Sequence, residues 1–237
     1  KLSNLSSAAY AQLIFWLLVP VVWLLVALLP RLNWRWAVMR ICAKLLFYLC
    51  RLPIKLEGIK NVPRDQTCVF VANHASYLDG AVLLAALPIK LTFITKIELE
   101  QRFFPRVFLR RIGAEFVERF DQEQGVAGAQ RAVQSILSGQ SLFFFPEGTF
   151  TRSPGLLPFR MGAFTTAATT NVPVVPISIH GTRSILRSGS SFPRRGIVSV
   201  IVIKPIMPQG SQWSAAVELR DISRAMILRY SGEPDLE

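Results

Sequence analysis

The sequence predicts an α/β fold in which helices cover a mixed sheet, preceded by a membrane-associated segment of two helices. Short apolar runs rich in β-branched and aromatic residues alternate with longer helical patterns along residues 54–237, as strands and helices do in α/β domains. Residues 10–29 form a nearly uninterrupted apolar stretch without a charge. We therefore expect two parts, a membrane-anchoring helical segment at residues 1–53 and an α/β domain at residues 54–237.

The composition favours contact with lipid. Hydrophobic residues make up 51% of the chain and charged residues 18%, while 27 Lys and Arg against 15 Asp and Glu give a net charge of +12. A basic excess suits an anionic membrane surface or nucleic acid, and the apolar excess favours the membrane. The 3 Cys match no zinc-binding spacing and there are only 2 His, so we expect neither a disulfide framework nor a metal site. Free thiols fit a reducing, cytosolic location.

The first elements to justify are the two N-terminal helices. Twenty helical residues reach about 30 Å, the thickness of a bilayer core. Because Pro20 lies in the middle of residues 10–29, two alternatives stay open: a kinked transmembrane helix, or two short helices entering one leaflet. A buried core helix is the non-membrane alternative. A second helix is predicted at residues 37–52, lying on the membrane surface. The basic and aromatic residues between the two are interpreted as interfacial anchors that place the following domain on the cytoplasmic side of the inner membrane; they are Arg31, Trp34, Arg35, Trp36 and Arg40.

The remaining elements follow from hydrophobic periodicity and from Gly and Pro. Strands are expected at residues 54–58, 68–71, 91–95, 114–117, 141–145, 174–179 and 197–203. Helices are expected at residues 80–87, 101–112, 123–137, 158–170 and 213–229. The helix at 101–112 places Arg among Phe residues, which favours a basic apolar rim that meets lipid headgroups. A helix packed on the sheet, or a nucleic-acid contact, would show the same pattern.

A His and an Asp frame the turn after the second strand. His74 follows the apolar run at 68–71, and Asp79 comes five positions later at a helix start. A carboxylate so placed can orient the imidazole and stabilise its protonated form, so His74 can take a proton from a hydroxyl. No Ser or Cys nucleophile is needed if that hydroxyl belongs to the substrate. The spacing alone is a weak signal, because it also occurs by chance.

A second motif, Phe145-Pro-Glu-Gly-Thr149, ends another strand. Together the two motifs resemble those of the glycerolipid acyltransferase family, the lysophosphatidic acid acyltransferases and their relatives. Blocks at residues 113–119 and 172–177 match that family in order and spacing. The resemblance covers roughly residues 55–208 and implies a fold like that of glycerol-3-phosphate acyltransferase.

The resemblance also implies an activity and a site. A fatty acyl chain would pass from acyl-CoA or acyl carrier protein to the free hydroxyl of lysophosphatidic acid, with His74 as general base and Asp79 as its orienter. Glu147 would bind glycerol hydroxyls or hold an Arg, and a structural salt bridge is its alternative role. The substrate-binding residues that the resemblance implies are Arg119, Glu147, Gly148, Thr149, Arg152 and Arg160.

One departure from the family pattern leaves the acceptor open. Many members carry Arg directly after Glu-Gly-Thr, whereas this chain has Phe150, with Arg152 two residues on. Acylation of another lysophospholipid or of a lyso-aminolipid is therefore the alternative activity. A basic membrane-binding module without catalysis, or a nucleic-acid binder, is the non-enzymatic alternative. The expected partners are the bilayer, the lysophospholipid acceptor and the acyl donor, with no nucleic acid and no metal or redox cofactor. His180 is interpreted as structural, since no carboxylate pairs with it in sequence.

Overall fold

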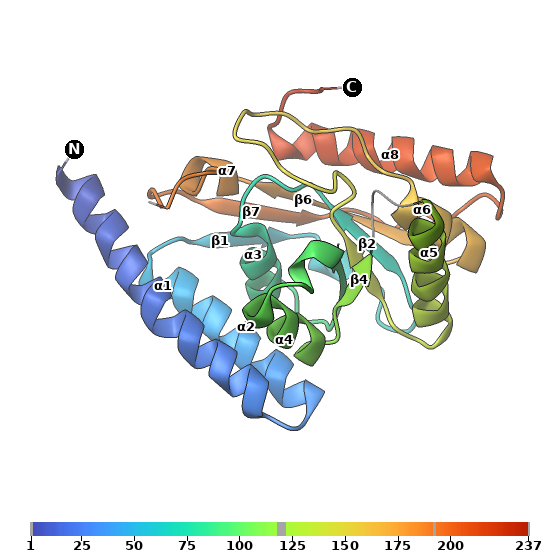
Figure 1. Cartoon of the computed structure of the whole chain (residues 1–237). Coiled ribbons are helices and arrows are strands. Elements are labelled where there is room, and N and C mark those ends of the chain that lie inside the picture. Colours follow the sequence, from blue (N-terminus) through green and yellow to red (C-terminus); the bar gives the residue numbers. More distant parts are fainter. Residues whose placement is uncertain (1, 118–121, 192, 237) are drawn as a thin grey trace.

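A seven-stranded sheet forms the centre of the molecule (Figure 1). The computed structural model describes residues 2–117, 122–191 and 193–236. The strands stand in the order β1-β7-β6-β2-β5-β3-β4. Their bounds are β1 Ile54–Glu57, β2 Val69–Ala72, β3 Thr92–Lys96, β4 Glu115–Val117, β5 Leu142–Phe144, β6 Val174–His180 and β7 Val198–Val202.

The sheet is mixed, as predicted. The strands from β6 to β4 in this order are parallel to one another, while β7 pairs antiparallel with β6 and β1 pairs parallel with β7. Parallel neighbours end at the same edge of a sheet, so the loops that follow β2 and β5 must lie next to each other. This edge carries both sequence motifs.

Helices cover both faces of the sheet. Strand β2 shows why: Val69 and Val71 pack into one hydrophobic cluster, Phe70 and Ala72 into another, and all four are buried. Alternate residues of a strand point to opposite faces, so an entirely apolar strand must be covered twice. Helices α5, α6 and α8 pack on the face of Val69, while α2 and α3 cover the other. The helices are α3 Asp79–Ala86, α4 Phe103–Arg111, α5 Gln122–Leu137, α6 Gly162–Thr170, α7 Thr182–Ile185 and α8 Trp213–Ser231, with short 3-10 turns at Ile59–Asn61 and Ile97–Leu99.

Two N-terminal helices pack side by side beneath α3 and α4 (Figure 1). They are α1 Leu2–Leu28 and α2 Leu32–Leu49. Helix α1 runs without a break through Pro20, so the alternative of two short helices is wrong. By length and composition its segment Ser7–Leu28 could cross a membrane, and only 6% of its most apolar window is buried. It is therefore not a core helix. Helix α2 contributes Met39 and Phe47 to the core of the α/β domain.

The basic and aromatic residues of this region differ from the prediction. Trp36 is buried and its indole N–H donates to the carbonyl of Ile112. The Arg35 guanidinium donates to the carbonyls of Leu29, Pro30 and Arg111, and Arg40 donates to that of Ile89. These three side chains join the helix pair to the α/β domain. Arg31 and Trp34 keep the exposed positions expected of anchors, with the guanidinium of Arg31 4.8 Å from the centroid of the Trp34 ring.

Candidate active site

Both motifs lie at one edge of the sheet, because β2 and β5 are parallel neighbours. Val71 stands opposite Phe144 in the register. The Asn73 side chain anchors the end of β2 to β6: its Nδ2 donates to the Ile179 carbonyl at 2.8 Å, and the Ile179 N–H donates to its Oδ1 at 2.7 Å. This reciprocal pair is buried. It holds the backbone at the point where His74 begins.

His74 and Asp79 form a hydrogen-bonded dyad. The Nδ1 of His74 lies 2.8 Å from Oδ2 of Asp79, and the carboxylate can only accept, so Nδ1 carries the proton. The same Oδ2 accepts the N–H groups of Ala75 at 2.7 Å and of Ser76 at 2.8 Å. Asp79 is fully buried, whereas the His74 side chain is 20% exposed. The lone pair of Nε2 is therefore available to a ligand, as a general base requires.

Glu147 ties the two motifs together through the main chain. Its Oε1 accepts the His74 N–H at 2.6 Å and its Oε2 accepts the Leu157 N–H at 2.9 Å. Burial raises the pKa of this carboxyl to about 7, although the two hydrogen bonds and the charge of Arg183 act in the opposite direction. No ion pair of Glu147 occurs within the ranges that the structure describes. Contact with glycerol hydroxyls stays a prediction; the observed contacts are those of a residue that positions His74.

The raised pKa of Glu147 predicts a pH-dependent stability. The folded protein binds this proton more tightly than the unfolded chain, whose glutamate has the ordinary value of 4.5. The contribution is complete below that value and is lost as pH rises to about 7. Between pH 4.5 and 8 we expect the free energy of unfolding to fall by about 3 kcal/mol more in the parent than in Glu147→Gln. Denaturant titrations at both pH values measure it. Glu218→Gln, at an exposed glutamate, controls for the lost charge, and equal slopes in parent and Glu147→Gln would contradict the prediction.

Aromatic rings surround the imidazole. The ring of His74 stacks on Phe145, with centroids 4.1 Å apart, and Phe150 lies 4.4 Å away. Phe150 also meets Tyr77 edge to face at 4.8 Å. Gly148 takes a φ of 74° at the turn after β5, a conformation that glycine adopts without strain. Phe150 thus contributes an apolar wall at the position where many family members have a cation.

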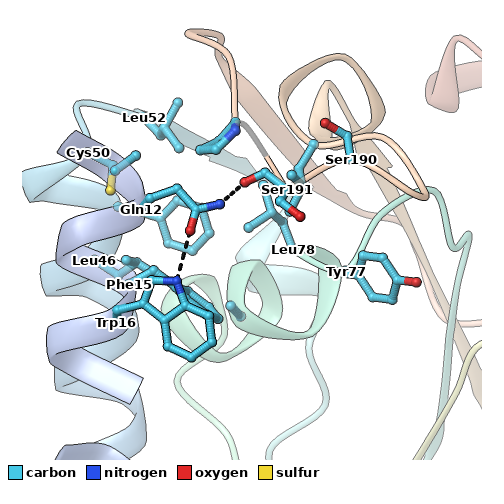
Figure 2. Close-up of a pocket in the computed structure, with 15 residues that line it drawn as sticks. Gln12, Phe15, Trp16, Leu46, Cys50, Leu52, Tyr77, Leu78, Ser190 and Ser191 are labelled. Carbon is cyan, nitrogen blue, oxygen red and sulfur yellow. Dashed lines mark hydrogen bonds between the residues drawn. The ribbon is translucent and has the colours of Figure 1, made fainter. Parts of the chain in front are cut away.

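An apolar pocket of about 400 Å³ lies beside the segment that joins His74 to Asp79 (Figure 2). Tyr77 and Leu78, which lie between His74 and Asp79, form one side of it. Helices α1 and α2 form another side, where Gln12 accepts a hydrogen bond from Trp16 and donates one to the Ser191 carbonyl. We call this cavity the apolar pocket; its lining comprises Ala11, Gln12, Phe15, Trp16, Leu46, Phe47, Cys50, Leu52, Tyr77, Leu78, Ala81, Leu186, Ser190, Ser191 and Pro193.

The other predicted residues are less closely gathered. Arg119 lies outside the described residues. Thr149, Arg152 and Arg160 are exposed, and the Arg160 N–H donates to the Pro146 carbonyl at 2.9 Å, which places its segment beside the Glu147 turn. Arg152 lies in a second, polar pocket.

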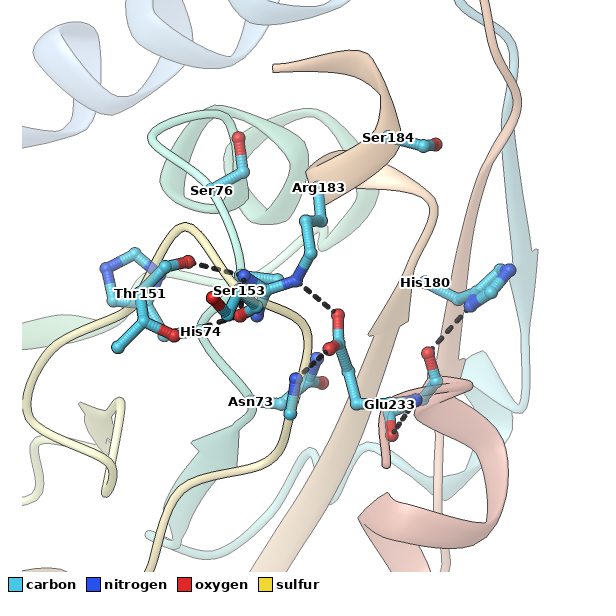
Figure 3. Close-up of polar contacts among 12 residues, drawn as sticks. Asn73, His74, Ser76, Thr151, Ser153, His180, Arg183, Ser184 and Glu233 are labelled. Atoms are coloured by element: carbon cyan, nitrogen blue, oxygen red, sulfur yellow. Dashed lines mark hydrogen bonds and ion pairs between the residues drawn. The ribbon is translucent and has the colours of Figure 1, made fainter. Parts of the chain in front are cut away.

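Sequence reasoning missed the buried pair Arg183 and Glu233. The Nε of Arg183 donates to Oε1 of Glu233 at 2.7 Å (Figure 3). These residues are 50 positions apart. Glu233 also follows the last helix in a polar tail, so no local pattern pointed to the pair.

Comparison with known proteins gives a consistent result. A family model described as Acyltransferase matches residues 53–180. A chloroplastic 1-acyl-sn-glycerol-3-phosphate acyltransferase of Brassica napus is 39% identical over 153 residues, which cover 64% of this chain and 44% of the relative. A probable 1-acyl-sn-glycerol-3-phosphate acyltransferase of Mycoplasma pneumoniae is 31% identical over 177 residues, which cover 69% of this chain and 65% of the relative. The chain thus spans less than two thirds of the length of either relative.

The fold also matches a solved structure. The crystal structure of PlsC, the 1-acyl-sn-glycerophosphate acyltransferase of Thermotoga maritima, superposes with a TM-score of 0.77. The match covers 96% of both chains at 23% sequence identity. At this identity the likeness establishes the fold.

Proposed function

The chain belongs to the acyltransferase family, and from this we propose that it transfers a fatty acyl chain from acyl-CoA or acyl carrier protein to the free hydroxyl of 1-acyl-sn-glycerol-3-phosphate. The observation that carries the proposal is the dyad. The Nδ1 of His74 is held 2.8 Å from a buried carboxylate, and Tyr77 and Leu78 of the same turn line an apolar pocket. A base in a turn that lines an apolar pocket suits a reaction in which the nucleophile is a hydroxyl of the lipid itself.

The proposed reaction uses both nitrogens of the imidazole. Nε2 of His74 takes the proton of the acceptor hydroxyl while the oxygen attacks the thioester carbonyl. The tetrahedral intermediate collapses, the C–S bond breaks, and the imidazolium returns the proton to the leaving thiolate. The products are an ester and a free thiol. Asp79 stabilises the transient imidazolium and keeps the proton on Nδ1, so that Nε2 stays a base.

The pockets suggest places for the substrates. The acceptor's acyl chain would enter the apolar pocket beside Tyr77 and Leu78, with its free hydroxyl at His74. The Glu147-Gly148-Thr149 turn, Arg160 and Arg119 would bind its glycerol phosphate, since guanidinium groups suit phosphate oxygens. No metal or redox cofactor takes part in this scheme.

A membrane location is part of the proposal. The α1 segment Ser7–Leu28 is apolar and largely exposed, and the chain carries a net charge of +12. An exposed apolar helix next to a basic domain favours an anionic leaflet. We propose that residues 1–53 anchor the enzyme and that residues 54–237 work on the cytoplasmic face of the inner membrane.

A lysolipid panel tests the function. The full chain in mixed micelles is incubated with acyl-CoA or acyl carrier protein thioester and with lysophosphatidate, lysophosphatidylethanolamine or lysophosphatidylglycerol, and products are identified by mass spectrometry. We expect phosphatidate as the main product. Absence of transfer to every lysolipid would refute the proposal. Transfer to another lysolipid but not to lysophosphatidate would support the alternative acceptor class. Phe150 favours that alternative because it places an aromatic ring 4.4 Å from His74.

A further inference from the structure

A second pocket opens on the α/β domain beside the active site. We call it the cationic pocket; it has a volume of about 360 Å³ and is lined by Arg152, Pro154, His180, Gly181, Arg183, Ser184, Arg187, Ser231, Gly232 and Glu233. Most of these residues lie beyond residue 180, where the family match ends. None of them belongs to α1 or α2, whereas those helices line the apolar pocket. The two pockets therefore differ both in chemistry and in the elements that build them.

A buried ion pair forms the wall of the cationic pocket (Figure 3). The Nε of Arg183 donates to Glu233, and its NH1 donates to the carbonyls of Thr151 and Ser153. Those carbonyls flank Arg152, so Arg183 fixes the loop that carries the Arg152 side chain. The other oxygen of Glu233 accepts the Gly155 N–H at 2.6 Å. The charge of Glu233 is thus balanced inside the wall.

Two exposed guanidinium groups of the cationic pocket take no part in this ion pair. Arg152 and Arg187 both line the pocket, and neither side chain forms an ion pair or hydrogen bond within residues 2–117, 122–191 and 193–236. His180 also lines the pocket, and its Nδ1 donates to the Ser231 carbonyl at 2.6 Å. The pocket consequently carries a net positive charge from groups without an internal partner. Such an arrangement suits a phosphate, whose oxygens match the fork of a guanidinium.

The cationic pocket lies close to the dyad. The charge of Arg183 lowers the pKa of Glu147, which in turn bonds the His74 backbone. The Ser76 hydroxyl, two residues after His74, donates to the Leu186 carbonyl at 2.7 Å. Leu186 lines the apolar pocket and Arg187 the cationic one. A ligand at His74 thus has lipid-like surroundings on one side of this segment and cations on the other.

We propose that the cationic pocket binds the phosphate at the end of the pantetheine arm of the acyl donor. The inference rests on the proposed function, because it assumes a thioester donor. A water-soluble polyanion can reach a pocket that the apolar helices do not line, and the arm would lead from the phosphate to the thioester at His74. Acyl-CoA and acyl carrier protein both carry this phosphate, so the pocket accounts for either donor.

The test separates the donor from the acceptor. Binding of coenzyme A to the full chain is measured by calorimetry, and KM values for acyl-CoA, acyl carrier protein thioester and lysophosphatidate are measured in micelles. We expect Arg187→Glu to weaken coenzyme A binding and raise the donor KM by about tenfold or more, the loss of a charged hydrogen bond. The KM for lysophosphatidate should stay within about twofold of the parent. Arg194→Glu makes the same charge change on an exposed residue of the same segment that does not line the pocket.

The outcomes show whether the cationic pocket binds the donor, the acceptor or neither. An unchanged donor KM and coenzyme A affinity in Arg187→Glu would overturn the subsite, as would equal losses in Arg194→Glu. A rise confined to the lysophosphatidate KM would assign the pocket to the acceptor and overturn the donor assignment. If the parent binds coenzyme A in an Arg187-dependent way yet acylates no lysolipid, the proposed function fails and the subsite stands.

Discussion

Replacing His74 with alanine is expected to lower kcat by a factor of about 10²–10⁴, the range that a positioned general base contributes. In the proposed mechanism Nε2 of His74 takes the proton of the acceptor hydroxyl, while Nδ1 is held by Asp79 at 2.8 Å. In the His74→Ala variant the hydroxyl must lose its proton to water. The initial rate of phosphatidate formation at saturating substrates measures the loss.

The measurement must separate chemistry from folding. His74 stacks on Phe145, so the variant also loses an aromatic contact. The melting temperature and the affinity for coenzyme A establish whether the remaining structure is intact. Loss of kcat with both retained supports the role of His74 as base. Parent-like kcat in a folded variant would mean that another group accepts the proton.

Asp79 is expected to affect both rate and stability. Its Oδ2 accepts three hydrogen bonds, one from the imidazole and two from main-chain N–H groups. Asp79→Asn keeps the shape but removes the charge that stabilises the imidazolium, and it allows the wrong tautomer. We expect kcat to fall by about 10²–10⁴. Asp79→Ala strands buried donors and should lower the free energy of unfolding by about 2–4 kcal/mol.

The rates and stabilities of the two variants are compared with each other and with those of a variant substituted on the surface. Kinetics with lysophosphatidate give the rate, and denaturant titration gives the free energy of unfolding. Asp221→Asn removes a carboxylate from the exposed side of α8 and should leave both quantities near those of the parent. An Asp79→Ala variant as stable as the parent would show that the turn does not depend on the carboxylate. Full activity in Asp79→Asn would remove Asp79 from the mechanism.

The strands were predictable from the sequence because their pattern is local. Runs such as Val69–Ala72 and Val198–Val202 are apolar and rich in β-branched residues, which the pleated core of a sheet favours. Helix ends were less predictable where distant contacts decide them. Helix α6 begins at Gly162 rather than at 158, since the Arg160 N–H is held by Pro146 and the Leu156 N–H by Pro234. Hydrogen-bond acceptors this distant in sequence leave no pattern near the segment that they restrain.

The features of the candidate site also differ in how far the sequence could predict them. His74 and Glu147 follow strand ends and Asp79 begins a helix, all within short motifs, so sequence could select them. The contact between Glu147 and the His74 N–H joins positions 73 residues apart and became visible only in the folded chain. The four-residue helix α7 follows Gly181, whose φ is 93°, between the strands predicted at residues 174–179 and 197–203, where no helix was expected. Its Arg183 and its neighbour Arg187 therefore carried no expected role.

The adjacency of Leu186 and Arg187 constrains how this segment can vary. Leu186 lines the apolar pocket and Arg187 lines the cationic pocket, so the boundary between the two proposed substrate sites crosses the chain at a single peptide bond. Substitutions can retune either side independently. Deletion of one residue before this bond would place the guanidinium of Arg187 at the apolar pocket, and insertion of one residue would place the isobutyl group of Leu186 at the cationic pocket. The proposal therefore requires this segment to keep its length as well as Arg187.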